Sequence, residues 1–175
     1  MGKRGAIIAA AALVLGLGLS GCAATSVEEA ARTELSNVVD QSIQRFDEDG
    51  GSETTSAGDG QYALIYDPSA PGGRQVVTAD LADSTSPAFG DVSTIAIHSM
   101  RTLLDSSEFA AAKVEAADGT FTAAGDSFRL EVRTRDGLVT QLNLDAGTGE
   151  TSASQAILMT YGMTPEARKI FDSVT

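Results

Sequence analysis

The clearest candidate for chemistry in this chain of 175 residues is its single cysteine, Cys22. It follows a segment in which Lys3 and Arg4 precede an uncharged, apolar run, Ala6–Leu19. The run is shorter than the roughly 20 residues that a membrane-spanning helix needs. A basic start, a short apolar core and small residues before a cleavage site are typical of an export signal. We therefore expect residues 1–21 to be removed during export.

The four residues Leu19-Ser20-Gly21-Cys22 resemble a bacterial lipobox, the motif that is cleaved before its cysteine. The resemblance implies cleavage between Gly21 and Cys22, with Cys22 acylated on sulfur and becoming the mature N-terminus. A thiol is needed because its sulfur attacks the lipid donor. Two or more acyl chains anchor a protein stably, whereas one chain is marginal. We expect a lipoprotein on the outer side of the cell membrane, with residues 22–26 as its lipidated tether.

Other patterns that would indicate catalysis or metal binding are missing from the sequence. His98 is the only histidine, and one histidine cannot build a histidine-rich zinc site. No serine lies in a Gly-x-Ser-x-Gly elbow, and acylation would consume the one thiol. A calcium loop counted from Asp47 would need glycine and glutamate where Ser52 and Gly58 stand. We expect no enzyme, no metal and no cofactor.

The charge balance argues against nucleic acid as a partner. The chain carries 12 Lys and Arg against 24 Asp and Glu, a formal net charge of −12. Removing Lys3 and Arg4 with the leader takes −12 to −14. Such a surface repels nucleic acid and anionic headgroups, so membrane contact should come from the anchor. One cysteine cannot form a disulfide within the chain, so the fold must rely on core packing.

The segment after the cysteine is predicted to form a helix over Val27–Phe46. Ser26 followed by Glu29 fits a capping box, a pattern common at helix starts. The polar stretch Asp47–Gly60 then predicts a flexible loop. The apolar residues that recur near helical spacing are Val27, Ala31, Leu35, Val38 and Phe46.

The rest of the chain alternates between strand and helix patterns. Residues 61–67 and 74–80 predict two strands, and residues 87–107 predict a helix. Thr164 before Pro165 is a strong helix start, which predicts a short C-terminal helix. Residues 27–175 should therefore form one α+β domain, a curved antiparallel sheet with helices packed on one face. The five other predicted strands span residues 112–117, 120–124, 127–134, 138–145 and 151–161.

The register of one hairpin can be predicted from its apolar faces. A two-residue Asp136-Gly137 loop would place Leu130 opposite the polar Asn143. A three-residue loop over residues 135–137 pairs Leu130 with Leu142 instead, so we expect that loop, with Gly137 left-handed. The same register pairs Phe128 with Leu144 and places Leu138 and Thr140 on the face of Leu142. The opposite face, predicted to meet water, carries Arg129, Glu131, Arg133, Gln141 and Asn143.

Ten apolar or aromatic residues are candidates for lining a ligand site. Buried apolar faces are the rule in folded domains, so these residues could equally form a solid core. A sheet that curves away from its helices would instead leave a lipid-sized gap, mostly apolar with a few polar groups at its mouth. The ten residues are Tyr62, Leu64, Tyr66, Phe121, Phe128, Leu130, Leu142, Leu144, Ile157 and Met159.

The region 91–162 resembles the LolA/LolB-like half-barrel carriers, and in style the LppX/LprG-type lipoproteins of actinobacteria. The similar stretches are RTLLDSS, then GTFTAAGDSFRLEVRTRDGLVTQLNLD, and the strand ILMTYG. The resemblance implies acyl chains carried under a curved sheet. On this basis we expect a membrane-anchored protein that binds an apolar ligand such as a lipid.

A second, local resemblance implies a different function. FRLEVRTRDGLVTQLNLDAGTGE looks like the strand pair of a PepSY module, whose second strand ends in a similar turn. Those modules are thought to regulate or inhibit proteins outside the membrane. The alternative is therefore an envelope protein-interaction module with a solid core. A continuous apolar cavity would favour the lipid ligand, and a flat exposed apolar patch would favour the protein partner.

Overall fold

The computed structural model describes residues 22–57, 60–70, 75–80, 96–147 and 153–174. The expected export segment, residues 1–21, and the first part of the expected helix, residues 87–95, lie outside the described residues. The elements, in chain order, are α1 (Cys22–Asp49), β1 (Gly51–Ala57), β2 (Gly60–Asp67), β3 (Gln75–Asp80), α2 (Ala96–Leu104), α3 (Ser107–Ala111), β4 (Lys113–Ala117), β5 (Thr120–Ala124), β6 (Phe128–Arg135), β7 (Leu138–Ala146), β8 (Ala153–Tyr161) and α4 (Pro165–Val174).

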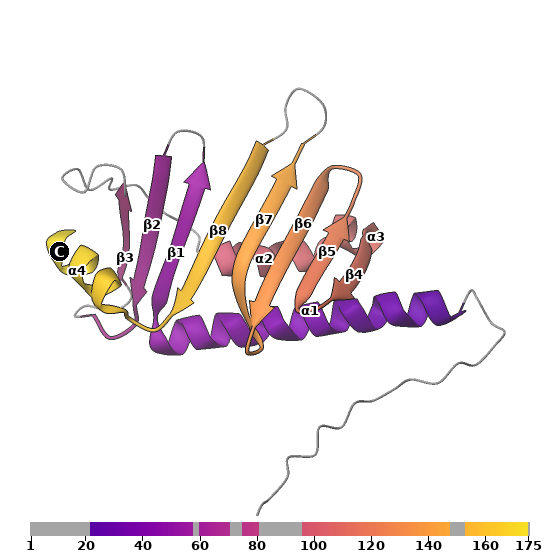
Figure 1. Cartoon of the computed structure of the whole chain (residues 1–175), viewed down its shortest axis with the longest axis horizontal. Coiled ribbons are helices and arrows are strands. Elements are labelled where there is room, and N and C mark those ends of the chain that lie inside the picture. Colours follow the sequence, from indigo (N-terminus) through magenta and orange to yellow (C-terminus); the bar gives the residue numbers. More distant parts are fainter. Residues whose placement is uncertain (1–21, 58–59, 71–74, 81–95, 148–152, 175) are drawn as a thin grey trace, which may run out of the picture.

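The strands form one antiparallel sheet in the order β3-β2-β1-β8-β7-β6-β5-β4. The sheet is curved and does not close into a barrel. Figure 1 shows α1 running along the ends of the strands, from β1 to beyond β4. The pairing of β1 with β8 joins the early strands to the late ones. The predicted α+β class with a curved antiparallel sheet is confirmed, and α1 and α2 pack on one face as predicted, whereas α4 packs on the other.

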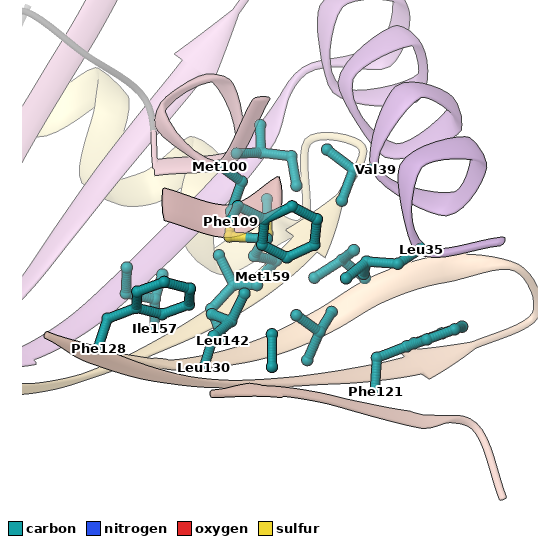
Figure 2. Packing of buried hydrophobic residues seen from close by; sticks show 14 of the residues in the cluster. Leu35, Val39, Met100, Phe109, Phe121, Phe128, Leu130, Leu142, Ile157 and Met159 are labelled. Carbon is teal, nitrogen blue, oxygen red and sulfur yellow. The ribbon is translucent and has the colours of Figure 1, made fainter. Parts of the chain in front are cut away.

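The main core lies between α1, α2 and one face of the sheet, here called the inner face. Leu35 and Val39 of α1 are fully buried, as is Ile97 of α2. Figure 2 shows Leu35, Val39 and Met100 pointing toward the strands. This burial is the main source of stability in a domain without a disulfide.

The C-terminal helix packs on the opposite, outer face of the sheet, at its β3 end. Side chains alternate between the two faces of a strand. Leu64 therefore joins the main core, whereas its neighbour Ile65 packs with Ala167 and Phe171 of α4. Asp67 also faces α4, and its Oδ2 accepts a hydrogen bond of 2.7 Å from Nη1 of Arg168. The helix expected from residue 165 is thus present, and it covers a second, smaller core.

The stretch Asp47–Gly60 is not the loop expected from its polar composition. Its first three residues end α1, and Gly51–Ala57 form β1, which pairs with β2 on one side and β8 on the other. The α1 helix also begins at Cys22, so the expected tether and its capping residue Ser26 are helical. A polar strand is stable here because both of its edges are paired and threonines favour extended backbone.

The β6–β7 hairpin has a two-residue turn and a bulge, so the predicted three-residue loop is wrong. Asp136 and Gly137 both have positive φ, 55° and 77°, which suits a tight turn. The register then shifts after Arg133, and Thr140 is the extra residue on β7. Apolar residues do face each other, but the pairs are Leu130 with Leu144 and Val132 with Leu142.

The bulge reverses which residues face the core in the part of β7 that precedes Thr140. Val139 is fully buried, in place of Leu138 and Thr140, which were expected on the inner face. Its N–H donates to Oγ of Ser42 at 2.9 Å, and its carbonyl accepts from the Tyr161 hydroxyl at 2.7 Å. Burial raises the pKa of Tyr161 to about 12, so this hydroxyl stays protonated and able to donate. On the predicted water face, Arg129 and Arg133 are exposed, and Glu131, Gln141 and Asn143 are half-buried.

Candidate functional site

A cavity of about 500 Å³ lies between the α2 helix and the inner face of β6, β7 and β8. Its size falls within the range of roughly 300–1,000 Å³ that small-molecule sites occupy. The floor consists of apolar side chains from the three strands, and α2 forms the roof. The floor residues are Phe128, Leu130, Leu142, Leu144 and Ile157.

These five floor residues are half of the ten residues that were predicted from the sequence to line a ligand site. Leu64, Tyr66, Phe121 and Met159 do not line the cavity, because they are buried in the main core. Tyr62 lies on β2 and is 38% exposed, so it is neither core nor cavity wall. Figure 2 shows Phe128 and Ile157 at one side of the cluster and Leu130 and Leu142 nearer its middle.

The roof residues were not among the site candidates. Ala96, Met100 and Leu103 face the cavity from α2, and Ala146 and Gly147 border it at the end of β7. The helical stripe of Met100 and Leu103 was evident in the sequence, but a stripe predicts packing and not space beneath it. The small side chains at Ala96, Ala146 and Gly147 are the one sequence feature that could have indicated space here.

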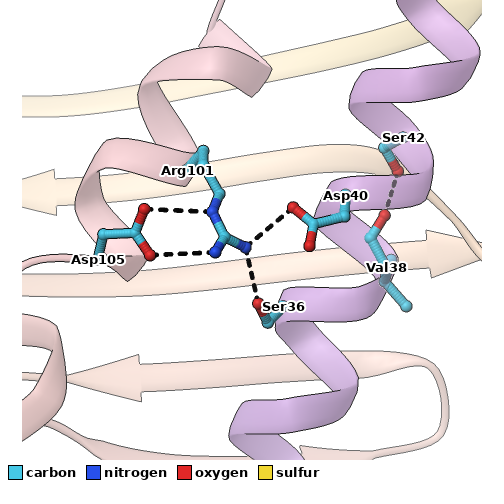
Figure 3. A network of polar contacts seen from close by, with 6 residues as sticks. All are labelled: Ser36, Val38, Asp40, Ser42, Arg101 and Asp105. Atoms are coloured by element: carbon cyan, nitrogen blue, oxygen red, sulfur yellow. Dashed lines mark hydrogen bonds and ion pairs between the residues drawn. The ribbon is translucent and has the colours of Figure 1, made fainter.

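An arginine holds the roof against α1. Nη1 of Arg101 donates to Oδ1 of Asp40 at 2.9 Å and to Oγ of Ser36 at 2.8 Å. Its Nε and Nη2 lie 3.2 Å from the two carboxylate oxygens of Asp105. Figure 3 shows the guanidinium of Arg101 reaching from α2 to both carboxylates. These contacts are partly exposed, so they position α2 more than they stabilise the fold.

A buried carboxylate holds the other end of the roof. Glu53 points inward from β1 and is only 3% exposed. Its Oε2 accepts from the N–H of Ala96 at 2.7 Å, and its Oε1 accepts from the N–H of Ile97 at 3.0 Å. The first N–H groups of a helix have no partner within the helix, so the carboxylate supplies one. Because Ala96 also lines the cavity, Glu53 fixes the edge of the roof.

Burial raises the pKa of Glu53 above its usual value of 4.5, and the two N–H bonds offset only part of that rise. A carboxyl with a raised folded-state pKa binds its proton more tightly in the folded protein than in the unfolded chain. Its contribution to stability is therefore complete below about pH 4.5, and this contribution is lost as the pH rises through the folded-state pKa. Glutamine does not titrate. We therefore expect Glu53→Gln to cost about 1–2 kcal/mol in unfolding free energy, with a larger cost near pH 4 than near pH 7.5.

Urea unfolding at the two pH values measures this cost directly. Glu34→Gln is the matched control, because Glu34 is exposed on α1 and should show a small cost at both values. A Glu53→Gln cost that grows as pH rises would contradict the prediction.

The rim of the cavity carries its polar groups. Ser99 of α2 and Gln155 of β8 are exposed at the rim, and Ser127 and Glu108 complete it. The hydroxyl of Ser127 donates to Oε1 of Glu108. An apolar interior with a polar mouth suits a ligand that has an apolar chain and a polar end.

The single histidine does not line this cavity. Nε2 of His98 is 3.3 Å from Oδ1 of Asp47, and neither residue lines the cavity. Within the described residues, no three or more His, Cys, Asp or Glu side chains gather as a metal site requires. In the same part of the chain, no helix combines the length and the apolar character needed to cross a membrane.

In comparisons with known proteins, the chain matches no protein-family model and no curated protein sequence. Its function must therefore be argued from the cavity and from the residues that form it.

Proposed function

We propose that this protein is an exported lipoprotein, anchored through Cys22, that binds an apolar ligand, most simply a lipid, without catalysing a reaction. The observation that carries the proposal is the cavity of about 500 Å³, with its apolar floor and polar rim. A solid core, the other outcome considered for these residues, would leave no room for a ligand.

The driving force for binding would be burial of the ligand chain. Each methylene moved from water into an apolar site contributes about 0.8 kcal/mol. About ten buried methylenes therefore contribute roughly 8 kcal/mol, which corresponds to a Kd on the order of 1 µM. The cost of ordering the chain weakens this value. A cavity of this size suits one acyl chain better than several.

The resemblance to LolA/LolB-like carriers and LppX/LprG-type lipoproteins supports the same proposal. Those proteins hold acyl chains under a curved, open sheet. The present sheet is open and curved, and α1 and α2 cover its inner face. The lipobox-like residues before Cys22 support membrane anchoring on the outer side. Because α1 begins at Cys22, an anchor there would hold the domain close to the bilayer.

The alternative proposal is an envelope protein-interaction module, resembling PepSY. It calls for a contiguous exposed apolar surface. Among the described residues, the large exposed hydrophobic side chains are Val27 on α1, Tyr62 on the inner face of β2 and Leu158 on the outer face of β8. They lie on separate elements, so the cavity gives the lipid proposal the stronger support.

Native mass spectrometry tests the proposal directly. Residues 22–175 with Cys22→Ala contain every described element, so this form can be purified without detergent and without an anchor. A stoichiometric adduct that extracts into organic solvent as a lipid supports the proposal. An unliganded mass that persists after incubation with envelope lipids refutes it.

Filling the cavity should prevent binding. Leu144 is half-buried and lines the cavity, so Leu144→Trp places an indole in the space that the ligand needs. Losing contact with about three methylenes costs roughly 2.4 kcal/mol, so we expect lipid affinity to fall more than tenfold. Displacement of a fluorescent apolar probe measures the affinity.

The matched control is Leu158→Trp. Leu158 lies on the outer face of β8, is 53% exposed and does not line the cavity. Its replacement should leave the affinity within about twofold of the unmodified protein. Equal affinity in both tryptophan variants would show that the ligand binds elsewhere.

A further inference from the structure

We propose that the cavity takes a single-chain lipid whose headgroup is uncharged and bears hydroxyl groups, and that Glu108 makes it discriminate against anionic headgroups. The inference rests on the proposed function, because it assigns a ligand class to the same cavity. It is carried by the chemistry of the rim and by the distribution of cations around it.

The rim offers hydrogen-bonding groups and one negative charge. Glu108 is exposed on α3, and its Oε1 already accepts from the hydroxyl of Ser127. Ser99 and Gln155, which are exposed, also line the cavity and add a hydroxyl and an amide to these polar groups. Hydroxyls and amides can both donate to and accept from a ligand hydroxyl, whereas a carboxylate only accepts. A polyol headgroup can satisfy all of these groups.

Among the described residues, no cation lines the cavity to bind an anionic headgroup. The lining residues include no Lys, Arg or His. Arg101 follows the lining residue Met100, but its guanidinium is engaged by Asp40 and Asp105. Arg129, next to Phe128, is exposed on the outer face. A phosphate or carboxylate at the rim would therefore face Glu108 without a compensating charge.

The two segments that supply most of the lining contain no Lys or Arg. Between Arg74 and Arg101, and again between Arg135 and Arg168, the chain contains no Lys or Arg. These two stretches include all the lining residues of β7 and β8 and most of those of α2. The formal charge of −12 adds a long-range repulsion of the same sign.

Three ligands with the same chain test the headgroup choice. Monomyristoylglycerol is neutral and carries two hydroxyls, whereas myristate and myristoyl lysophosphatidic acid are anionic. Each is used to displace a neutral fluorescent probe, N-phenyl-1-naphthylamine, from residues 22–175 with Cys22→Ala. We expect monomyristoylglycerol to bind at least about tenfold more tightly than either anion, as repulsion between like charges at a partly exposed rim predicts.

The outcomes separate this inference from the proposed function. An anionic ligand that binds as tightly as monomyristoylglycerol overturns the inference and leaves lipid binding standing. A failure of all three ligands to bind, together with an unliganded native mass, overturns both.

The variant Glu108→Gln tests the role assigned to the carboxylate. We expect it to tighten the binding of both anions about fivefold and to change the affinity for monomyristoylglycerol by less than about twofold. Glu34→Gln removes the same charge from an exposed site on α1 outside the cavity, so it should leave the preference unchanged. An unchanged preference in Glu108→Gln, or an equal change in both variants, overturns the assignment to Glu108.

Discussion

Replacing Cys22 by alanine is expected to abolish fatty-acid labelling of the protein and to move it from the membrane fraction to the soluble fraction. The reason is chemical, because the reaction with the lipid donor needs a sulfur nucleophile and Cys22 is the only cysteine in the chain. Repulsion between a net negative protein and anionic headgroups leaves no electrostatic substitute for the anchor. Metabolic labelling with an alkyne fatty acid in a bacterial host, followed by fractionation, measures both effects.

Two further substitutions separate acylation from folding. Cys22→Ser keeps a side chain of nearly the same shape and should also lose the label, because a hydroxyl is a much weaker nucleophile than a thiolate. Ser20→Ala keeps a small residue in the lipobox-like stretch and should retain the label. Strong labelling of Cys22→Ala would refute the lipoprotein proposal, whatever its effect on the cavity.

The pattern of alternating residues predicted the late strands of the sheet well. Residues 112–117, 120–124, 127–134 and 138–145 were each expected to be strands, and β4 to β7 lie within about one residue of these bounds. Turn chemistry explains where these strands end, since Asp118-Gly119 and Asp136-Gly137 adopt the positive φ angles that tight turns require, although the length of the second turn was predicted wrongly. Local sequence determines such turns, so local reasoning finds them.

The errors come from features that depend on distant partners. The strand β1 is polar along its length, and its place in the sheet depends on pairing with β2 and with β8, about 100 residues further along the chain. The bulge at Thr140 depends on two distant residues that bind the backbone of Val139. Ser42 accepts a hydrogen bond from the N–H of Val139, and the Tyr161 hydroxyl donates one to its carbonyl. Neither contact leaves a periodic pattern in the sequence.

The candidate site was predictable in part for the same reason. Period-two alternation placed Leu130, Leu142 and Ile157 on one face of the sheet, and these residues form the floor. The space above them depends on the height and tilt of α2. That position is set by Glu53 at one end of the helix and Arg101 near the other. Glu53 is a charged residue in a polar stretch, so nothing in its neighbourhood indicates that it is buried under α2.

The second large effect is expected from Gly51→Ala at the start of β1. Gly51 lies between Tyr161 of β8 and Tyr66 of β2, where the ring of Phe46 covers the strand. A Cβ at this position would lie 2.2 Å from the carbonyl oxygen of Thr160 and 2.8 Å from the Phe46 ring. Because one of these contacts is to backbone, side-chain rotation alone cannot relieve it.

We expect Gly51→Ala to lower the free energy of unfolding by about 3 kcal/mol or more, a large share of the roughly 5–15 kcal/mol typical of a domain.

Gly162→Ala is the matched control. Gly162 has a φ of 80°, but a Cβ there would meet nothing within 4 Å. Its replacement should cost only about 1 kcal/mol, the strain of a left-handed alanine. Urea unfolding of both variants compares the two costs. Equal costs would contradict the prediction, because they would show that the contacts of the added Cβ with Thr160 and Phe46 are relieved at little cost.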